Sequence, residues 1–456
     1  MTPGPPDDDR LDQLRQIGDP EADGLAAALR EGHEDLDERD IVRLVLDRLV
    51  HPDRLSTDDE LGAWMFGGPP LPDWADEAKL RAGQDFFECW TLPICTALFC
   101  ASLPTGYAGA KGVQVLALTS DLASGDMRRR VAETAQMLVD IMDPGPRSPA
   151  TLEPGGQGHL TVRGVRLLHA VVRDAILTSP LVTHTCDESV PIRWCADWGH
   201  PINQEDLLGT LLTFTVSVLN ALDKLGIPYD PEGAEGYVHV WCVVGSQLGI
   251  DPSLLPADRA EAQAMADVIY RRQHGRSIAG ERLMSVLLTQ MELAMPWGLR
   301  NLPRTMVRHL TRPGVADLLG VPKAAWWSPP LRRLGGVGPL IRKVPGLRRL
   351  CEAPGDLLSR AMIRMFVDAT MDGERPAFRL DATTARALAI HSSAARRQRR
   401  RRRVVARATR GAPAPTHHGP GAALLTGHPA PDPDAPAPGP GPDQGPGSGS
   451  GEELAS

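Results

Sequence analysis

The sequence of 456 residues contains few signals for β-strands and none of the short motifs that mark the commonest hydrolase and nucleotide-binding sites. It has no H-E-x-x-H, no G-x-S-x-G, no P-loop and no C-x-x-C-H. No run of alternating apolar and polar residues is bounded by turn pairs. The absences argue against those enzyme classes and predict a mainly α-helical chain.

Targeting and membrane signals are also lacking. Residues 1–10 have neither the basic n-region nor the apolar h-region of a secretory signal, so a cytoplasmic location is expected. Residues 89–110 are uncharged and long enough to cross a bilayer, but Pro93 and Pro104 interrupt them. Residues 207–222 are apolar but shorter than a bilayer span. Both stretches are expected to be core helices.

The seven cysteines are an odd number spread along the chain. Cys89, Cys95 and Cys100 fall in a largely apolar stretch. This distribution fits reduced, buried thiols better than a secreted disulfide framework.

Composition divides the chain into four parts. These are a disordered lead-in at residues 1–10, a single helical domain at 11–390, an arginine-rich segment at 391–410 and a disordered Pro/Gly-rich tail at 411–456. The whole chain has a net charge of −8 although residues 396–410 hold nine arginines and no acid, so its body is acidic. Specific binding to nucleic acid is therefore not expected. The five arginines from Arg399 to Arg403 are expected to make at most a weak contact with an anionic surface.

Helical periodicity predicts most of the secondary structure. The expected helices cover residues 11–17, 41–49, most of 74–143, the surroundings of His169, 204–225, 233–249, 257–273 and 279–293. Gly- and Pro-rich loops are expected at residues 67–73 and 144–158. Asn203 is the expected N-cap of the helix at 204–225, with Asp206 at its third position.

His169 lies on the apolar face of a predicted helix, in a stripe with Val165 and Val172. Arg166 and Arg173 lie three residues before it and four residues after it, on neighbouring turns of the same surface. An anionic cofactor with a metal at its centre needs one imidazole and nearby cations. The alternative is a core histidine that is bonded to a carbonyl, with two arginines that extend to water.

A second polar group lies upstream on an apolar helix face. Arg130 and Thr134 are four residues apart and align with Met137 and Ile141. A buried arginine requires an anion to offset its charge. That anion is either a Glu or Asp from another helix or a carboxylate of a cofactor.

Residues 198–206 form a third feature, which is predicted to be a turn followed by a helix cap. His200 is a candidate second ligand, but its position in a loop before a proline favours a structural role. Four residues of the types that bind zinc have a spacing that matches none of the common zinc patterns: His184, Cys186, Cys195 and His200.

In combination, these segments resemble the catalytic domain shared by latex clearing protein, a bacterial rubber oxygenase, and the mycophenolic-acid-pathway oxygenase B family. The segments are Arg130-x-x-x-Thr134, V-R-L-L-H-A-x-V-R at residues 165–173 and P-I-N-Q-E-D-L at 201–207. The resemblance covers roughly residues 60–320, and the ordered combination is more specific than any single segment.

The resemblance implies an all-α, globin-related fold that holds a b-type haem without a covalent bond, with extra N- and C-terminal helices. It implies that His169 binds the iron, with its other ring nitrogen held by a carbonyl or carboxylate. Arg130, Arg166 and Arg173 are then candidates to contact the haem propionates, and Thr134 to position a water molecule or an arginine. Studied members cleave carbon-carbon double bonds of isoprenoid chains with dioxygen and give carbonyl products.

Two features differ from the rubber-cleaving branch of this family. Glu133 stands where that branch has a lysine just before the threonine, and that branch is secreted. The expected substrate is therefore an apolar, isoprenoid-derived small molecule rather than polyisoprene, used with an unidentified reductant. Glu133 is a candidate distal base, although it points about 100° away from Thr134 around the helix.

Two other classes of function remain open. The first is a haem-binding sensor or electron-transfer protein without turnover. The second is a haem-free helical interaction protein whose arginine-rich segment and tail bind a partner.

Overall fold

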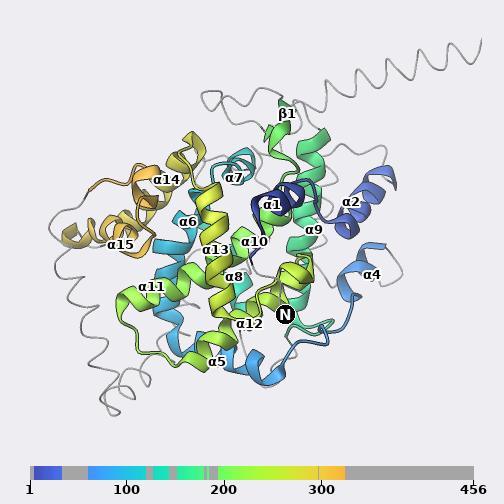
Figure 1. The fold of residues 1–456 in the computed structure, drawn as a ribbon, viewed down its shortest axis with the longest axis horizontal. Coiled ribbons are helices and arrows are strands. Elements are labelled where there is room, and N and C mark those ends of the chain that lie inside the picture. The colour runs from blue at the N-terminus through green and yellow to red at the C-terminus, as the bar shows by residue number, and fades with distance from the viewer. Residues whose placement is uncertain are drawn as a thin grey trace, which may run out of the picture. The chain divides into compact units, whose positions relative to one another are not determined.

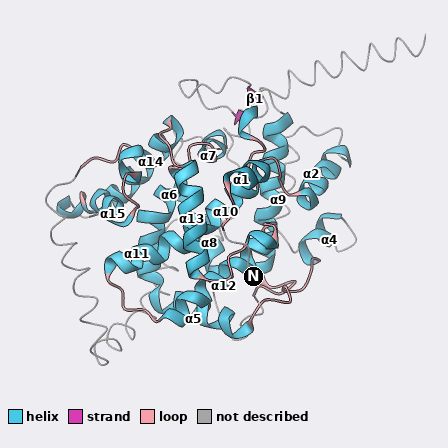
Figure 2. Ribbon diagram, in the orientation of Figure 1, coloured by secondary structure: helices cyan, strands magenta, loops and turns pink. Residues whose placement is uncertain are grey.

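Helices make up nearly all of the described chain, as Figure 2 shows by colour. The computed structural model describes residues 5–32, 60–119, 127–142, 151–178, 182–183, 194–295 and 297–323. All of them belong to one unit of the chain, Met1–Arg400. The expected all-α class is confirmed.

The elements are labelled in Figure 1 in chain order. The first half holds α1 (Asp8–Arg15), α2 (Pro20–Gly32), α4 (Glu60–Phe66), α5 (Glu77–Ala97), the π-helix η2 (Leu98–Ser102), α6 (Leu103–Tyr107), α7 (Val113–Leu118), α8 (Met127–Met142), α9 (Gln157–Thr178), β1 (Val182–Thr183), β2 (Trp194–Cys195) and the 3-10 helix η3 (Ala196–Trp198). The second half holds α10 (Gln204–Leu212), the π-helix η4 (Thr213–Ser217), α11 (Val218–Leu225), α12 (Pro231–Gln247), the 3-10 helix η5 (Pro252–Leu254), α13 (Arg259–Gln273), α14 (Ile278–Ala294), the 3-10 helix η6 (Trp297–Leu299), α15 (Leu302–Leu310) and α16 (Val315–Leu318). The two strands pair in parallel, with Val182 opposite Trp194.

The N-terminal lead-in is shorter than expected. Helix α1 begins at Asp8 because the side chain of Asp7 caps it by accepting a 2.8 Å hydrogen bond from the backbone N–H of Arg10. The prediction of disorder was therefore wrong for residues 8–10. Helix α2, which starts at Pro20, was not predicted as a separate helix.

The uncharged stretch after Cys89 is a kinked helix, not a straight rod. Trp90 has non-helical angles (φ −116°, ψ 23°) within α5, because Pro93 offers no N–H and its ring crowds the preceding turn. The helical run Glu77–Tyr107 and the run Gln204–Leu225 are long and apolar enough to cross a membrane, but 56% and 72% of their most apolar windows are buried inside the protein. Both runs are therefore mostly buried, as expected for core helices.

The second half of the chain follows its predicted periodicity. The predicted helix at 204–225 is a continuous run of α10, η4 and α11, and Asn203 caps it by accepting a 3.0 Å hydrogen bond from the N–H of Asp206. Helices α12, α13 and α14 each agree with prediction to within about two residues at either end.

The core is built around the crossing of α5 and α12, which have the most extensive contact of any two helices. Gly83 on α5 and Gly236 on α12 meet backbone to backbone. A Cβ built on Gly83 would collide with the carbonyl group of Gly236, and one on Gly236 would lie 2.5 Å from the N of Gly83. The missing side chains therefore let the two helices approach.

Helix α9 forms the other centre of packing, and Figure 1 shows it with α1, α2 and α4 beside it. Residues of α2, α4 and α9 share one apolar cluster that includes Leu25, Trp64 and Leu167. The opposite side of α9 packs against α8 and α12. The N-terminal helices thus cover one side of α9.

Several predictions concern parts of the chain outside the described residues. These are the helix at 41–49, the loop at 144–150, the arginine-rich segment with Arg399 to Arg403 and the tail at 411–456.

The α5–α12 crossing gives a test of packing. We expect Gly83→Ala to lower the free energy of unfolding by about 2–3 kcal/mol, because the added methyl group forces the two backbones apart. Gly24→Ala on α2 is the matched control. No heavy atom lies within 4 Å of its Cβ position, so it should raise stability by up to about 1 kcal/mol. Urea unfolding of both variants measures the difference, and equal effects would contradict the close crossing.

Candidate functional site

Helix α9 holds His169 in an almost fully buried stretch. Residues 162–167 and 170–171 are buried, whereas Leu168 and His169 remain partly exposed. Burial, reinforced by the positive charge of Arg173 and opposed by Asp19, lowers the pKa of His169 to about 4. The imidazole is therefore neutral near pH 7 and keeps a lone pair available for a metal.

The Nδ1 atom of His169 is buried and has no hydrogen-bond partner. The sequence offered a core histidine bonded to a carbonyl as the alternative to a ligand, and the described residues supply no such bond to Nδ1. The carbonyl or carboxylate expected on the second ring nitrogen of a metal ligand is likewise not found there. His169 is thus a neutral imidazole whose Nδ1 is buried without a hydrogen bond, as are the Nδ1 atoms of His159 and His200. A buried polar atom without a partner is explained by strain, a catalytic role, or a bound water or ion.

Arg166 lies beside His169 and pairs with the N-terminal segment. Its Nε and Nη2 atoms donate to the two carboxylate oxygens of Asp19 at 2.6 and 2.8 Å, and Nη2 also donates to Glu21 at 2.8 Å. Burial opposes the charged guanidinium, but the hydrogen bond and the charge of Asp19 outweigh it and raise the pKa of Arg166. Arg166 therefore remains a cation that Asp19 holds in a forked pair.

Arg173 is almost fully buried on the other side of His169. Its Nη1 pairs with Asp23, its Nε donates to the carbonyl of Pro201 at 2.8 Å, and its Nη2 donates to the carbonyl of Ile202 at 2.6 Å. The bonds to Pro201 and Ile202 join α9 to the start of the 201–207 segment, so two of the three resembling segments meet in space, and the bond to Asp23 joins α9 to α2. Ile202 has φ +53°, a left-handed conformation that is rare for a β-branched residue.

These contacts correct the expected role of the two arginines. Both were predicted to contact a cofactor anion or, alternatively, to extend to water. Instead, Arg166 and Arg173 are held by Asp19, Glu21 and Asp23. A carboxylate 147 residues away in the chain satisfies Arg166, and no local sequence pattern indicates such a pairing.

Glycines permit this close packing at two points. A Cβ on Gly249, which has φ +87°, would collide with the carboxylate of Asp19 and lie 2.8 Å from Nε of Arg166. A Cβ on Gly18 would lie 2.6 Å from Oδ2 of Asp23. Both ion pairs therefore depend on a glycine, because the side chain of any other residue at these positions would displace the carboxylate.

The segment after Ile202 is tied to the same N-terminal residues. Gln204 donates to the carbonyls of Gly18 at 2.8 Å and Gly249 at 2.9 Å. Glu205 is completely buried and accepts from Arg15 at 3.2 Å and from Arg272 at 3.0 Å. The capping role predicted for Asn203 and Asp206 is confirmed, and it is one part of this network.

Helix α8 carries the other candidate residues and packs against α9. Thr134 is half-buried there. Arg130 and Glu133 belong to the same helix, but their side chains lie outside the described residues. Their predicted roles stay predictions.

Sequence reasoning also missed Arg163, which is 3% exposed on α9. Its Nε donates to the carbonyl of Trp64 at 2.7 Å, and its guanidinium carbon lies 3.8 Å from the centroid of the Trp64 ring. Burial and the charge of Arg166 lower the pKa of Arg163 to about 10. Arg163 lies three residues before Arg166, one turn closer to the start of α9, and this helical spacing indicates that the two arginines share a face.

A multi-residue metal centre is not found in the described part of the chain, where no group of three or more His, Cys, Asp or Glu side chains is placed to hold an ion. Cys195 is disulfide-bonded, which removes it as a thiolate ligand and contradicts the expected reduced state for this cysteine. Cys95, Cys100 and Cys242 are reduced thiols that are partly or fully buried, as expected, whereas the reduced thiol of Cys89 belongs to an exposed residue, contrary to the expected burial. A single histidine ligand suits a haem, whose porphyrin supplies the other donors.

Comparisons with known proteins indicate the family and the fold of this chain. A family model for the catalytic domain of the ER-bound oxygenase mpaB/B' and rubber oxygenase matches residues 94–343. A rubber oxygenase of Streptomyces sp. (strain K30) is 26% identical over 282 residues, which are 60% of this chain and 63% of that protein's length. The structure of latex clearing protein in the closed state superimposes with a TM-score of 0.55 at 23% identity, covering 78% of this chain and 91% of that one.

The Arg166–Asp19 pair gives a direct test of the network. We expect Asp19→Asn to lower the free energy of unfolding by about 3–5 kcal/mol, because it leaves the buried guanidinium without its forked partner. Glu21→Gln is the matched control, since Glu21 contacts the same arginine but its side chain is 58% exposed. It should cost less than about 1 kcal/mol. Similar losses for both variants in urea unfolding would contradict the importance of the buried pair.

Proposed function

Because the chain belongs to the family of the ER-bound oxygenase mpaB and rubber oxygenase catalytic domain, we propose that it is a haem-dependent oxygenase in which His169 binds the iron. The observation that carries this proposal is the His169 imidazole, which is neutral, partly exposed on a buried helix and unsatisfied at Nδ1. It suits a metal ligand better than a structural histidine.

A bound haem supplies an iron centre at which dioxygen is activated for attack on a carbon-carbon double bond. The chain's own residues prepare that site. His169 need not lose a proton before it binds a metal, because its pKa lies well below 7. Val165 and Val172 flank it on the same helix face and give it apolar neighbours.

The arginines divide into two roles in this proposal. Arg166 and Arg173 are engaged by carboxylates, so they position α9 and do not bind the propionates of a haem. Arg130 on α8 remains the candidate for a propionate contact, with Thr134 on the next turn to hold it or a water molecule. Glu133 remains a candidate distal base.

The proposed substrate is an apolar, isoprenoid-derived small molecule, which reacts with dioxygen. The family name supports an oxygenase, and the relative from Streptomyces is named for rubber. The rubber-cleaving branch has a lysine at the position of Glu133, so its distal acid/base arrangement does not carry over to this chain. The reductant is a separate component.

Haem binding is tested by two histidine variants. Purified protein that is supplied with haemin should show a Soret band and a b-type pyridine haemochrome spectrum. His169→Ala should lose most of this absorbance because the axial ligand is gone. His200→Ala, which removes the second candidate ligand, should retain it. A protein that stays colourless with haemin, or equal loss in both variants, would overturn the assignment.

Turnover is tested by oxygen uptake. Haem-loaded protein with a chemical reductant should consume oxygen when an apolar isoprenoid such as squalene is added, and a carbonyl product should be trapped by a hydrazine reagent. Haem-loaded protein without reductant and saturated squalane serve as controls. Stable haem binding with no alkene-dependent uptake would favour the sensor or electron-transfer alternative.

A further inference from the structure

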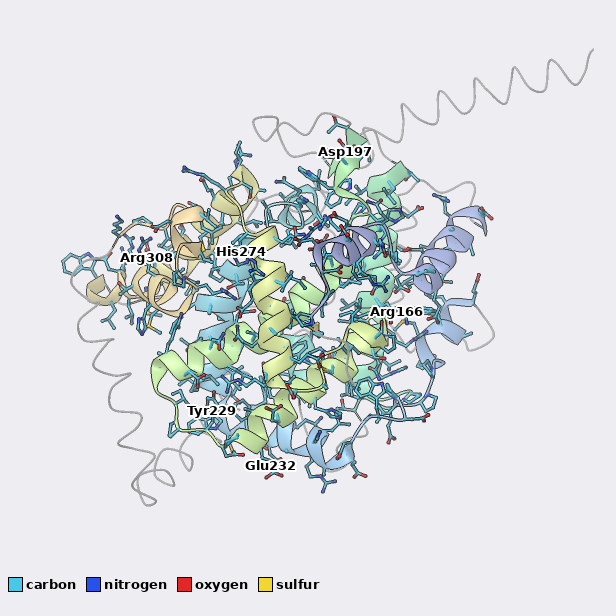
Figure 3. All side chains as sticks on the ribbon, in the orientation of Figure 1. Arg166, Asp197, Tyr229, Glu232, His274 and Arg308 are labelled. Carbon is cyan, nitrogen blue, oxygen red and sulfur yellow. The ribbon has the colours of Figure 1, made fainter. Side chains whose placement is uncertain are left out.

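A cavity of about 580 Å³ lies at the C-terminal end of α13, and the His169 site is not part of it. It is lined by Tyr270, Arg271, His274, Arg276 and Arg312, together with Pro313, Gly314, Val315, Asp317 and Leu318. The one acidic side chain of this lining, Asp317, pairs with Arg308. Figure 3 shows His274 on the side of the molecule that faces α14 and α15, well away from the labelled Arg166. The volume is in the range that holds a small organic molecule.

The cavity wall is rich in positive charge. Arg312 pairs with Asp267 at 2.6 Å, and Arg276 pairs with Glu281 at 2.5 Å. Arg271 is exposed and makes no ion pair with any described residue. Arg271 lies in the last turn of α13, where a positive charge interacts favourably with the helix dipole. This interaction by itself is a structural reason for an arginine at this position. One of the three wall arginines is therefore available to a ligand anion.

Two stacked aromatic rings form another part of the wall. The rings of Tyr270 and His274 lie parallel within 11°, with centroids 4.9 Å apart, and the guanidinium carbon of Arg312 lies 5.6 Å from the Tyr270 centroid. Burial, together with the charge of Arg312, lowers the pKa of His274 to about 4. The imidazole is therefore neutral at pH 7, so this wall offers a planar aromatic surface beside cationic groups.

We propose that this cavity binds a small aromatic anion, whose ring extends the Tyr270–His274 stack by lying against the half-buried His274 imidazole and whose carboxylate or phosphate pairs with Arg271. Charge distinguishes this ligand from the apolar substrate proposed for the His169 site, because an apolar chain gains nothing from the guanidinium group of Arg271. The site is therefore a second binding site with its own ligand class. Carboxylate and phosphate share the chemistry that an arginine recognises.

The experiment compares three probes that have the same ring. Benzoate carries a carboxylate, phenyl phosphate a phosphate, and benzamide no charge. Isothermal titration calorimetry on the full chain should detect both anions, with benzamide at least tenfold weaker, and higher ionic strength should weaken only the anions. The stronger of the two anions identifies the head group that the site prefers. If neither anion binds at 10 mM, or if benzamide binds equally well, the proposal is wrong.

Two arginine variants locate the binding. Arg271→Gln should raise the dissociation constant of the anions about three- to fivefold, because one exposed charge pair is lost. Arg282→Gln is the matched control, since Arg282 is exposed on α14, lies outside the cavity wall and makes no ion pair with a described residue. In addition, a bound anion should shift the ring-proton resonances of His274. The Arg271→Gln protein could be fully folded and bind the anions as tightly as the Arg282→Gln protein. In that case Arg271 interacts only with the helix dipole, and the proposal is wrong.

Discussion

The buried pair of Arg166 and Asp19 is the contact on which the rest of the α9 region depends. A guanidinium group cannot lie in the core without an anion, and the N-terminal segment supplies it. Such a pair adds little net stability compared with an apolar contact, but the loss of one partner is costly. Its effect is therefore to determine which segment covers α9. Only a segment with carboxylates at positions 19 and 23 satisfies both Arg166 and Arg173.

The same network sets the electrostatic surroundings of His169. Arg173 and burial keep the imidazole neutral, while Asp19 partly offsets the positive charge. The N-terminal carboxylates thus affect a histidine that they do not touch. The feature that first indicated a cofactor site, a histidine between two arginines, therefore combines one ligand candidate with two packing residues.

Sequence patterns predicted the features that depend on residues close together in the chain. The run Gln204–Leu225 and its Asn203 cap follow from apolar periodicity and from hydrogen bonds that span three residues. The partners of Arg166 and Arg173 did not follow, because they lie about 150 residues away and any acid would satisfy the same sequence pattern. Helix α2 was missed because it contains an internal Gly24, which weakens the helical signal of the sequence. The fold class was therefore predictable, whereas the environment of the site required the tertiary structure.

The two π-helices are also features that sequence periodicity could not predict. A π-turn leaves carbonyl groups without their usual helical partners, and in a core they must be satisfied by side chains. In η4, the carbonyl of Phe214 accepts a 3.0 Å hydrogen bond from the hydroxyl of Tyr237 on α12, and the Ser217 hydroxyl lies 3.4 Å from that of Tyr270 on α13. Burial raises the pKa of both tyrosines, which therefore stay neutral. A regular period of 3.6 residues cannot encode such turns, because their partners come from other helices. Tyr270 contributes its ring to the cavity and its hydroxyl to η4, so one side chain joins the cavity wall to the core.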